Sequence, residues 1–359
     1  MDVWDFSTRD RDEIRKSSAF FQNKRKGRVV ALGYFDGVHK GHSAILEEAC
    51  KLADFVDGIP AVHTFSSAPV SKGKNHSSSC ESGQDAIHLT TYKEKEGLLR
   101  SAGIEEIMLF PFDQTLSETS AEDFLENDIK DLLGARGIVA GSDYRFGRNR
   151  EGTVEYLRRW CQREGIEIRI TPQQHVGDKV VSSSKIRQAL LDGRTDEANA
   201  LLGYPISFSG VVEKGFQIGR TMQFPTANTR IEQGKIVPRY GVYATVFYCE
   251  PGPGAQCEEG EPHRMGDGFL LSAVSNIGLR PTFLREEKNP VMETVLLKRN
   301  CDLYGKRVRV FLLSFVRPER RFSSVPELEE QVRRDIECVQ NYHDSHIIDH
   351  SIYSTSVLL

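Results

Sequence analysis

Two histidines follow a glycine-rich turn in the segment Gly33-Tyr34-Phe35-Asp36-Gly37-Val38-His39-Lys40-Gly41-His42. The turn lies between a predicted buried strand, Arg28–Leu32, and a predicted helix, Ser43–Phe55. In a parallel sheet, ligands collect beyond the carboxyl ends of the strands, where the next helix offers free N–H groups and a positive dipole end. His39 and His42 could then donate hydrogen bonds to a phosphate and stabilise the more negative transition state when pyrophosphate leaves. Surface histidines on a turn, or half of a metal site, are the alternative interpretations; no third metal ligand with matching spacing follows.

A second polar cluster lies at the start of a predicted helix, Lys185–Asp192. The segment Val181-Ser182-Ser183-Ser184-Lys185-Ile186-Arg187 brings together three hydroxyls, an ammonium and a guanidinium. Capping alone would need one serine. The cluster suits the β- and γ-phosphates of a nucleotide, with Arg187 as a forked donor. A capped helix with solvated charges is the alternative.

A third group of polar residues lies in the second half of the chain. The run Gly210–Arg220 is rich in glycine, and Phe224-Pro225-Thr226-Ala227-Asn228 places a hydroxyl beside a carboxamide. Hard oxygen ligands of this kind suit Mg²⁺ bridging ATP phosphates. The pattern GxxxxGK[ST] is absent, which excludes a P-loop kinase. A polar turn in a barrel is the alternative for the Thr–Asn segment by itself.

The elements that must position these groups change in character along the chain. Predicted strands at Ile59–Phe65, Ile107–Phe110, Gly137–Val139 and Ile166–Ile170 alternate with predicted helices at Tyr92–Ala102, Ala121–Leu133 and Val154–Glu164. This alternation predicts an α/β domain with a parallel sheet. After Leu202 the predicted strands Ser207–Glu213, Val242–Tyr248, Phe269–Val274, Val291–Leu297 and Val308–Phe315 follow one another without helices, and a helix at Leu328–Asn341 comes last. This second part predicts a small barrel closed by one helix.

Composition sets limits on the class of protein. The 359 residues are enough for about two domains. The net charge of −4 argues against a nucleic-acid binder that works through bulk charge. No run of about 18 apolar residues predicts a membrane span. The seven cysteines are scattered and contain no CxxC pair, so we expect a reducing, cytoplasmic location.

The first two clusters together carry a family resemblance. They resemble the nucleotidyltransferase HxGH superfamily, specifically the FAD synthetase module of bacterial bifunctional riboflavin biosynthesis proteins. Further matches are Gly141-Ser142-Asp143-Tyr144-Arg145-Phe146-Gly147 with Arg150-Glu151-Gly152, and Leu89-Thr90-Thr91 with Lys95. The resemblance implies a Rossmann-like α/β domain that transfers the adenylyl group of ATP to FMN, forming FAD and releasing pyrophosphate.

The resemblance also implies roles for residues of this domain. His39, His42 and Arg187 would be catalytic. ATP would contact residues of the turn and of the serine cluster: Gly33, Phe35, Asp36, Gly37, Gly41, Ser183, Ser184 and Lys185. Asp143, Arg145 and Phe146 would surround the flavin. The family often has a histidine in a Phe-x-Pro-His-Pro stretch, whereas this chain has Ala68 in Phe65-Ser66-Ser67-Ala68-Pro69.

The C-terminal part resembles riboflavin kinases. The Pro-Thr-Ala-Asn signature is joined by Asn276–Phe283, Met292-Glu293-Thr294, Asp302–Gly305 and Arg317–Phe322. The resemblance implies a small β-barrel domain with a C-terminal helix that phosphorylates riboflavin to FMN, with ATP as co-substrate and ADP as product. It implies Glu293 as general base, Thr226 and Asn228 as Mg²⁺ ligands, Gly215, Gly219 and Arg220 as ATP contacts, and Arg280 as a flavin contact.

The whole chain is therefore expected to contain four parts: an N-terminal extension over residues 1–26, a FAD synthetase domain over 27–201, a riboflavin kinase domain over 202–342 and a tail over 343–359. Met222-Gln223 stand where the family usually has a glycine before Phe-Pro-Thr. The alternative function is a riboflavin kinase whose N-terminal domain binds flavin nucleotides without efficient FAD synthesis; another HxGH adenylyltransferase is a third. Riboflavin, FMN, FAD, ATP, ADP and pyrophosphate are the expected partners, with no nucleic acid and no membrane.

Overall fold

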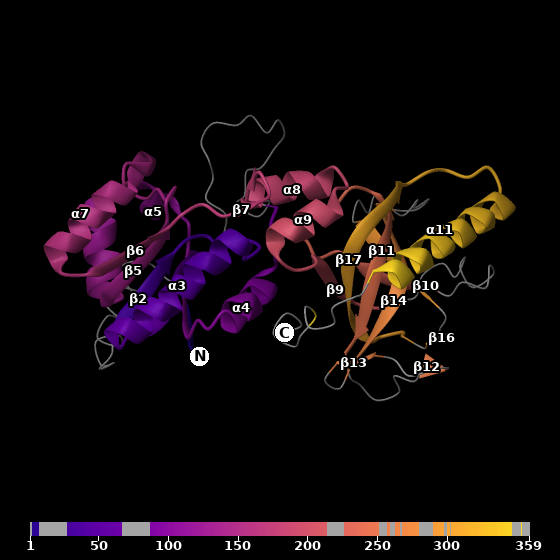
Figure 1. Ribbon diagram of the computed structural model, residues 1–359, viewed down its shortest axis with the longest axis horizontal. Coiled ribbons are helices and arrows are strands. Elements are labelled where there is room, and N and C mark those ends of the chain that lie inside the picture. The colour runs from indigo at the N-terminus through magenta and orange to yellow at the C-terminus, as the bar shows by residue number, and fades with distance from the viewer. Residues whose placement is uncertain are drawn as a thin grey trace. The chain divides into compact units, whose positions relative to one another are not determined.

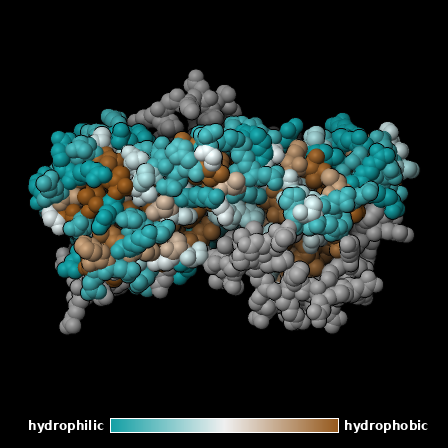
Figure 2. Space-filling view, viewed as in Figure 1, coloured by the Kyte–Doolittle hydropathy of each residue, from teal (hydrophilic) through white to brown (hydrophobic). Residues whose placement is uncertain are grey.

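The computed structural model describes residues 2–6, 27–66, 87–213, 226–250, 257–258, 263–265, 268–279, 290–297, 300–301, 303–346 and 353. The chain forms two compact units, Met1–Ser182 and Ser183–Leu359. Each unit has a central sheet and its own hydrophobic core (Figure 1). In the view of Figure 2, hydrophilic residues cover much of the described surface, and the visible hydrophobic residues lie in recesses between them.

The first unit is built on a parallel six-stranded sheet of order β1-β4-β3-β2-β5-β6. Its strands are β1 (Asp2–Asp5), β2 (Arg28–Leu32), β3 (Ile59–Phe65), β4 (Glu106–Phe110), β5 (Ala135–Gly141) and β6 (Glu167–Thr171). The main helices are α3 (Lys40–Val56), α4 (Tyr92–Ser101) and α7 (Val154–Glu164), with short segments α5 (Gln114–Glu118), α6 (Ala121–Asp123) and η2 (Arg148–Arg150). A two-stranded ribbon, β7 (His175–Val176) with β8 (Lys179–Val180), completes the unit. The expected α/β domain with a parallel sheet is confirmed.

The two faces of this sheet are buried against different helices. Val30 and Leu32 of β2 belong to the core cluster that includes Ile129 and Trp160. On the other face, α3 packs so closely on the sheet that a Cβ at Gly137 would lie 3.0 Å from both Leu52 of α3 and Val29. The N-terminal segment expected to be an extension contributes β1, an edge strand paired with β4.

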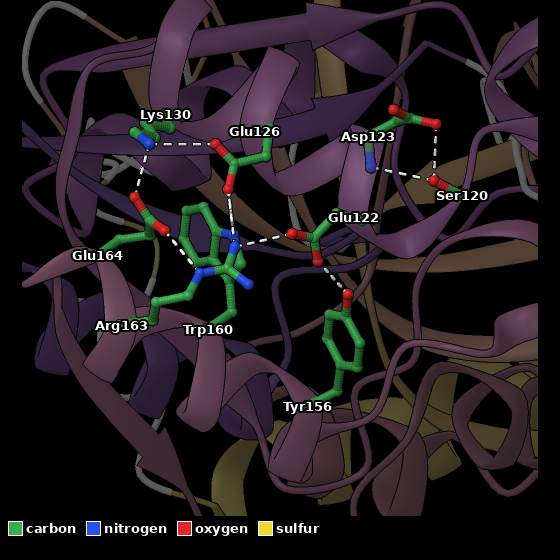
Figure 3. Close-up of polar contacts among 9 residues, drawn as sticks. All are labelled: Ser120, Glu122, Asp123, Glu126, Lys130, Tyr156, Trp160, Arg163 and Glu164. Atoms are coloured by element: carbon green, nitrogen blue, oxygen red, sulfur yellow. Dashed lines mark hydrogen bonds and ion pairs between the residues drawn. The ribbon is translucent and has the colours of Figure 1, made fainter.

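The predicted helix Ala121–Leu133 differs from the observed one. It consists of α6 followed by a π-helix, η1 (Phe124–Leu132). Polar contacts to α7 accompany this change (Figure 3): Trp160 Nε1 donates to Glu126 Oε1 at 2.8 Å, and Arg163 lies 2.7 Å from Glu122 and 2.9 Å from Glu126. Lys130 bridges Glu126 and Glu164. Tyr156 of α7 also donates its hydroxyl to Glu122.

The second unit starts with α8 (Ser183–Leu191) and α9 (Thr195–Leu202), followed by an antiparallel sheet of order β10-β15-β14-β11-β17-β9. These strands are β9 (Ser207–Val211), β10 (Thr226–Arg230), β11 (Gly241–Cys249), β14 (Gly268–Leu279), β15 (Pro290–Leu296) and β17 (Arg307–Pro318). β13 (His263–Met265) pairs with β14, and β12 (Cys257–Glu258) pairs with β16 (Asn300–Cys301). The backbone N–H of Glu213 donates to Asn228 at 2.9 Å, which links the two end strands. The expected small barrel is confirmed.

The long helix α11 (Val325–Ser345) covers one face of the barrel. Val339 packs there with Val242, Ala244 and Val246 of β11. Arg317 at the end of β17 donates twice to the buried carboxylate of Asp335, at 2.6 and 2.8 Å, and so anchors the middle of the helix. In the segment expected to be a tail, Tyr353 is buried and its ring packs edge-on against Phe311 at 4.7 Å.

Candidate functional sites

The turn between β2 and α3 has an unusual backbone. Phe35 and Val38 have positive φ angles of 54° and 32°, which are rare for residues with side chains, and Gly37 has a φ of 80°. Gly33 lies against the ring of Phe35, where a Cβ would come within 3.0 Å of the ring carbons. Such strain persists only where the surroundings hold it, and it is concentrated at functional sites.

His39 and His42 lie on the first turn of α3, which begins earlier than the predicted Ser43. His39 is the N-cap, and its Nδ1 accepts a hydrogen bond of 3.2 Å from the backbone N–H of His42. Because Nδ1 is an acceptor in this bond, the proton of the His39 ring lies on Nε2 whenever the ring is neutral. The two imidazoles stack with centroids 3.7 Å apart and planes 11° apart. The structure thus brings both predicted catalytic histidines of this unit together.

His42 is held neutral by its surroundings. Burial, followed by the charges of His39 and Lys95, lowers its pKa well below the usual value of 6.5. Phe35 packs on one side with ring centroids 5.1 Å apart, and no described residue forms a hydrogen bond with Nδ1. A neutral imidazole donates a hydrogen bond from one nitrogen only, so His42 suits polarisation of a phosphate rather than an ion pair with it.

Asp36 faces the protein rather than an open surface. Its carboxylate accepts hydrogen bonds from the backbone N–H of Leu89 at 3.0 and 3.1 Å and from that of Thr90 at 3.3 Å. The hydroxyl of Thr90 in turn accepts from the N–H of Gly37 at 3.2 Å. These bonds tie the turn to the segment that leads into α4, so any effect of Asp36 on ATP would act through the shape of the turn.

Lys95 is a feature of this site to which the sequence reasoning gave no role. It projects from α4 and is only 6% exposed. Its Nζ donates to the carbonyls of Phe65 at 3.1 Å and Tyr34 at 3.4 Å, and to Thr64 Oγ1 at 3.5 Å. The sequence shows only that Lys95 lies in a predicted helix. The folded structure is needed to show that its ammonium is buried at the carboxyl ends of β2 and β3.

The three predicted flavin contacts after β5 have different environments. Asp143 and Arg145 are exposed, whereas Phe146 is buried in the core between Tyr144 and Phe124, with ring centroids 5.6 Å from each. Gly152 pairs with Phe146, and a Cβ there would come within 2.7 Å of its ring. Phe146 therefore supports the loop from within, whereas Asp143 and Arg145 present their side chains at the surface.

The predicted phosphate cluster lies at the start of α8, in the second compact unit. Ser184 and Lys185 are exposed there, while Ser183 and Arg187 are half-buried. Ile186 and Leu190 are buried and fix this helix by its apolar face. The polar side chains therefore project from a helix start whose N–H groups favour anions.

The predicted kinase residues meet on adjacent strands of the barrel. In the register of β10 with β15, Asn228 lies directly opposite Glu293, and Asn276 of β14 lies opposite Glu293 on its other side. Partners of this kind have Cβ atoms about 5 Å apart. Glu293 is exposed, as a base for an external substrate must be. The other predicted contacts, Gly215, Gly219, Arg220 and Arg280, lie outside the described residues.

Thr226 and Asn228 share one face of β10, as alternate residues of a strand do. Asn228 Nδ2 lies 3.5 Å from Thr226 Oγ1, and Asn228 Oδ1 is buried with no hydrogen-bond partner among the described residues. An orphaned carboxamide oxygen beside a hydroxyl fits the hard ligands of Mg²⁺. The described residues contain no cluster of three or more His, Cys, Asp or Glu that could hold a metal, so ATP phosphates and water would have to supply the other ligands.

The loop after β17 supports the same end of the barrel. Asn276 Nδ2 lies 3.5 Å from the carboxylate of Glu319. At Gly278 a Cβ would overlap that carboxylate, since the two would be 2.0 Å apart. The Glu319 carboxylate thus occupies the space beside Gly278 and connects the loop to the strand beside Glu293.

Comparisons with known proteins match the two parts of the chain to two families. A family model described as FAD synthetase matches residues 21–185, and one described as riboflavin kinase matches residues 202–343. Proteins named bifunctional riboflavin kinase/FMN adenylyltransferase are 31% identical to this chain in Buchnera aphidicola, over 89% of this chain and 94% of the relative, and in Escherichia coli K12, over 90% and 95%. The relative of that name in Listeria monocytogenes is 31% identical, over 86% and 90%.

A solved structure is also similar over most of the chain. It is a crystal structure of a protein named macrolide-efflux protein from Streptococcus pneumoniae, with a TM-score of 0.74, 32% identity, and coverage of 89% of this chain and 95% of that one. In the described part of the present chain, no helix is long and apolar enough to span a membrane.

Proposed function

Because the chain belongs to the bifunctional riboflavin kinase/FMN adenylyltransferase family, we propose that its two sites act in turn to convert riboflavin to FMN and FMN to FAD. ATP is the co-substrate of both reactions. The products ADP and pyrophosphate, Mg²⁺ as the metal, and a cytoplasmic location belong to the same proposal.

In the kinase reaction, Glu293 takes the proton of the ribityl 5′-hydroxyl of riboflavin. The oxygen attacks the γ-phosphorus of ATP, the bond to the β-phosphate oxygen breaks, and ADP leaves. Thr226 and Asn228 would hold Mg²⁺, which supplies charge neutralisation of the ATP phosphates. The exposed Glu293 opposite the orphaned oxygen of Asn228 is the observation that carries this half.

In the adenylyl transfer, a phosphate oxygen of FMN attacks the α-phosphorus of ATP and pyrophosphate leaves. No covalent enzyme intermediate is required, so positioning and charge stabilisation supply the catalysis. His39 and His42 would contact the ATP phosphates, and Ser183, Ser184, Lys185 and Arg187 would bind the leaving pyrophosphate. The turn residues Gly33, Phe35, Gly37 and Gly41 would shape the ATP site, with Asp143, Arg145 and Phe146 on the flavin side.

One pair of incubations tests the proposal. The full chain is supplied with ATP and Mg²⁺ and either riboflavin or FMN, and FMN, FAD and pyrophosphate are measured. We expect FMN from riboflavin, and FAD with equimolar pyrophosphate from FMN. FMN production without any FAD would contradict the bifunctional assignment and support a kinase whose first domain only binds flavin nucleotides. Omission of Mg²⁺ is expected to stop both reactions.

A further inference from the structure

All three N–H donors of the Lys95 ammonium have acceptors within the protein. The three oxygens within reach are the carbonyls of Phe65 and Tyr34 and the hydroxyl of Thr64. The ring of Tyr34 adds a cation–π contact, with Nζ 4.9 Å from its centroid. Since no donor remains for a substrate phosphate, Lys95 can act on the reaction only through the groups that it holds.

Those groups belong to the two strand ends that border the histidines. Tyr34 lies in the turn after β2 and Phe65 ends β3, while the hydroxyl of Thr64 also donates to the Tyr34 carbonyl at 2.9 Å. The turn contains the strained residues Phe35 and Val38 and leads directly into His39. A strained turn needs surroundings that hold it, and Lys95 fixes its first peptide to the neighbouring strand.

The positive charge of Lys95 also acts on His42. No carboxylate among the described residues lies within ion-pair distance of the ammonium. The carboxylate that acts on it electrostatically is that of Asp36, which accepts hydrogen bonds from the N–H groups of Leu89 and Thr90. Burial lowers the pKa of Lys95 to about 8, and Asp36 opposes this shift. The cation in turn helps to lower the pKa of His42.

We propose that Lys95 is a positioning residue for adenylyl transfer, whose buried ammonium holds the turn before His39 against the end of β3 through the carbonyls of Tyr34 and Phe65. This inference rests on the proposed FMN adenylyltransferase function. Burying an ammonium without a carboxylate partner costs stability, and in this site it supplies a positive field next to where ATP phosphates would lie.

The inference has a pH signature. The titratable and charged groups around the two residues are Asp36 in the turn, His39 at the N-cap, and His88 and Glu94 on the segment entering α4; His88 Nδ1 contacts the Tyr34 hydroxyl and Glu94 closes the cap of α4. Lys95 is charged below pH 8 and loses its proton above it. An arginine stays charged throughout this range. Adenylyl transfer should therefore weaken above about pH 8 only when residue 95 is lysine.

The experiment measures kcat/KM for ATP between pH 7 and pH 10 with saturating FMN, on the full chain, because this ratio reports groups of the enzyme form that ATP binds. For the wild type, kcat/KM should fall toward tenfold per pH unit above about pH 8. Lys95→Arg should remove this alkaline fall. Lys51→Arg is the matched control, because Lys51 is an exposed lysine of α3 paired with Glu47, and it should keep the wild-type profile.

Lys95→Met provides a second, spectroscopic readout. Without the cation, the pKa of His42 should rise, which histidine NMR measures directly and which a merely structural role would not predict. The riboflavin kinase activity of each variant should stay within twofold of the wild type. Equal alkaline falls in wild type and Lys95→Arg, or an unchanged His42 pKa in Lys95→Met, would overturn the inference. If neither variant folds, a wild-type profile that stays flat to pH 9.5 would overturn it, whereas absence of FAD at every pH would overturn the proposed function instead.

Discussion

The imidazole of His39 caps the helix that carries His42, and the two rings stack with centroids 3.7 Å apart. One histidine thereby fixes both the backbone and the ring plane of the other. This coupling makes the pair a single unit, so a change at the small residue between them should act on both.

Replacing His42 by alanine should abolish FAD formation and leave FMN formation intact. The imidazole is expected to stabilise charge on the ATP phosphates, and the loss of one such donor typically costs about 100-fold or more in kcat. Both reactions are measured on the same preparation. If kinase activity were lost as well, the two activities would not reside in separate parts of the chain.

Replacing Gly41 by alanine should reduce adenylyl transfer at least about tenfold without destabilising the protein. A Cβ at this position would lie 3.1 to 3.2 Å from the ring of His39, so the ring must move, while alanine favours a helix by up to ~1 kcal/mol over glycine. Thermal unfolding and FAD formation are compared with wild type. A variant of unchanged activity would show that the stacked geometry is not needed.

Replacing Glu293 by glutamine should lower the kinase kcat by about 100-fold or more, the usual contribution of a general base, with little change in riboflavin binding. Glutamine keeps the shape between Asn228 and Asn276 but cannot accept the proton. Glu330→Gln on the exposed face of α11 is the control, since Glu330 only pairs with Arg334. Unchanged turnover in Glu293→Gln would exclude Glu293 as the base.

Asn228 offers a test of the metal site. Asn228→Leu removes the buried oxygen and should abolish kinase activity at any Mg²⁺ concentration, whereas Asn228→Asp keeps an oxygen ligand and should retain Mg²⁺-dependent activity. The readout is the Mg²⁺ dependence of FMN formation. If FMN formation by the two variants depended on Mg²⁺ in the same way, Asn228 would not be a metal ligand.

Asp335→Asn should destabilise the C-terminal unit by about 3 kcal/mol, because it leaves the Arg317 guanidinium without its buried carboxylate partner. Denaturant unfolding, followed by kinase activity, measures the change. The exposed Asp344→Asn near the end of the same helix is the control and should be neutral. Equal midpoints for the two variants would show that the ion pair does not anchor α11.

The local sequence pattern was sufficient to predict the limits of some helices and strands. The helix Val154–Glu164 and the strand Ile59–Phe65 have the predicted limits, because hydrophobic periodicity and capping residues lie within the segments themselves. The start of α3 was predicted late, since a histidine is not a usual N-cap. The π-helix η1 was not predictable, because its contacts come from α7, more than twenty residues further along the chain.

The motifs in the sequence by themselves determined the family, the two activities and most residue types at the sites, because these depend on short segments of fixed spacing. Only the tertiary structure placed Asn228 opposite Glu293 and Cys257 opposite Cys301, since strand register is set by the whole sheet. It likewise turned Asp36 and Phe146 inward and buried the Lys95 ammonium against the carbonyls of Tyr34 and Phe65. Burial and charge at those positions depend on packing between distant segments, which no local pattern encodes.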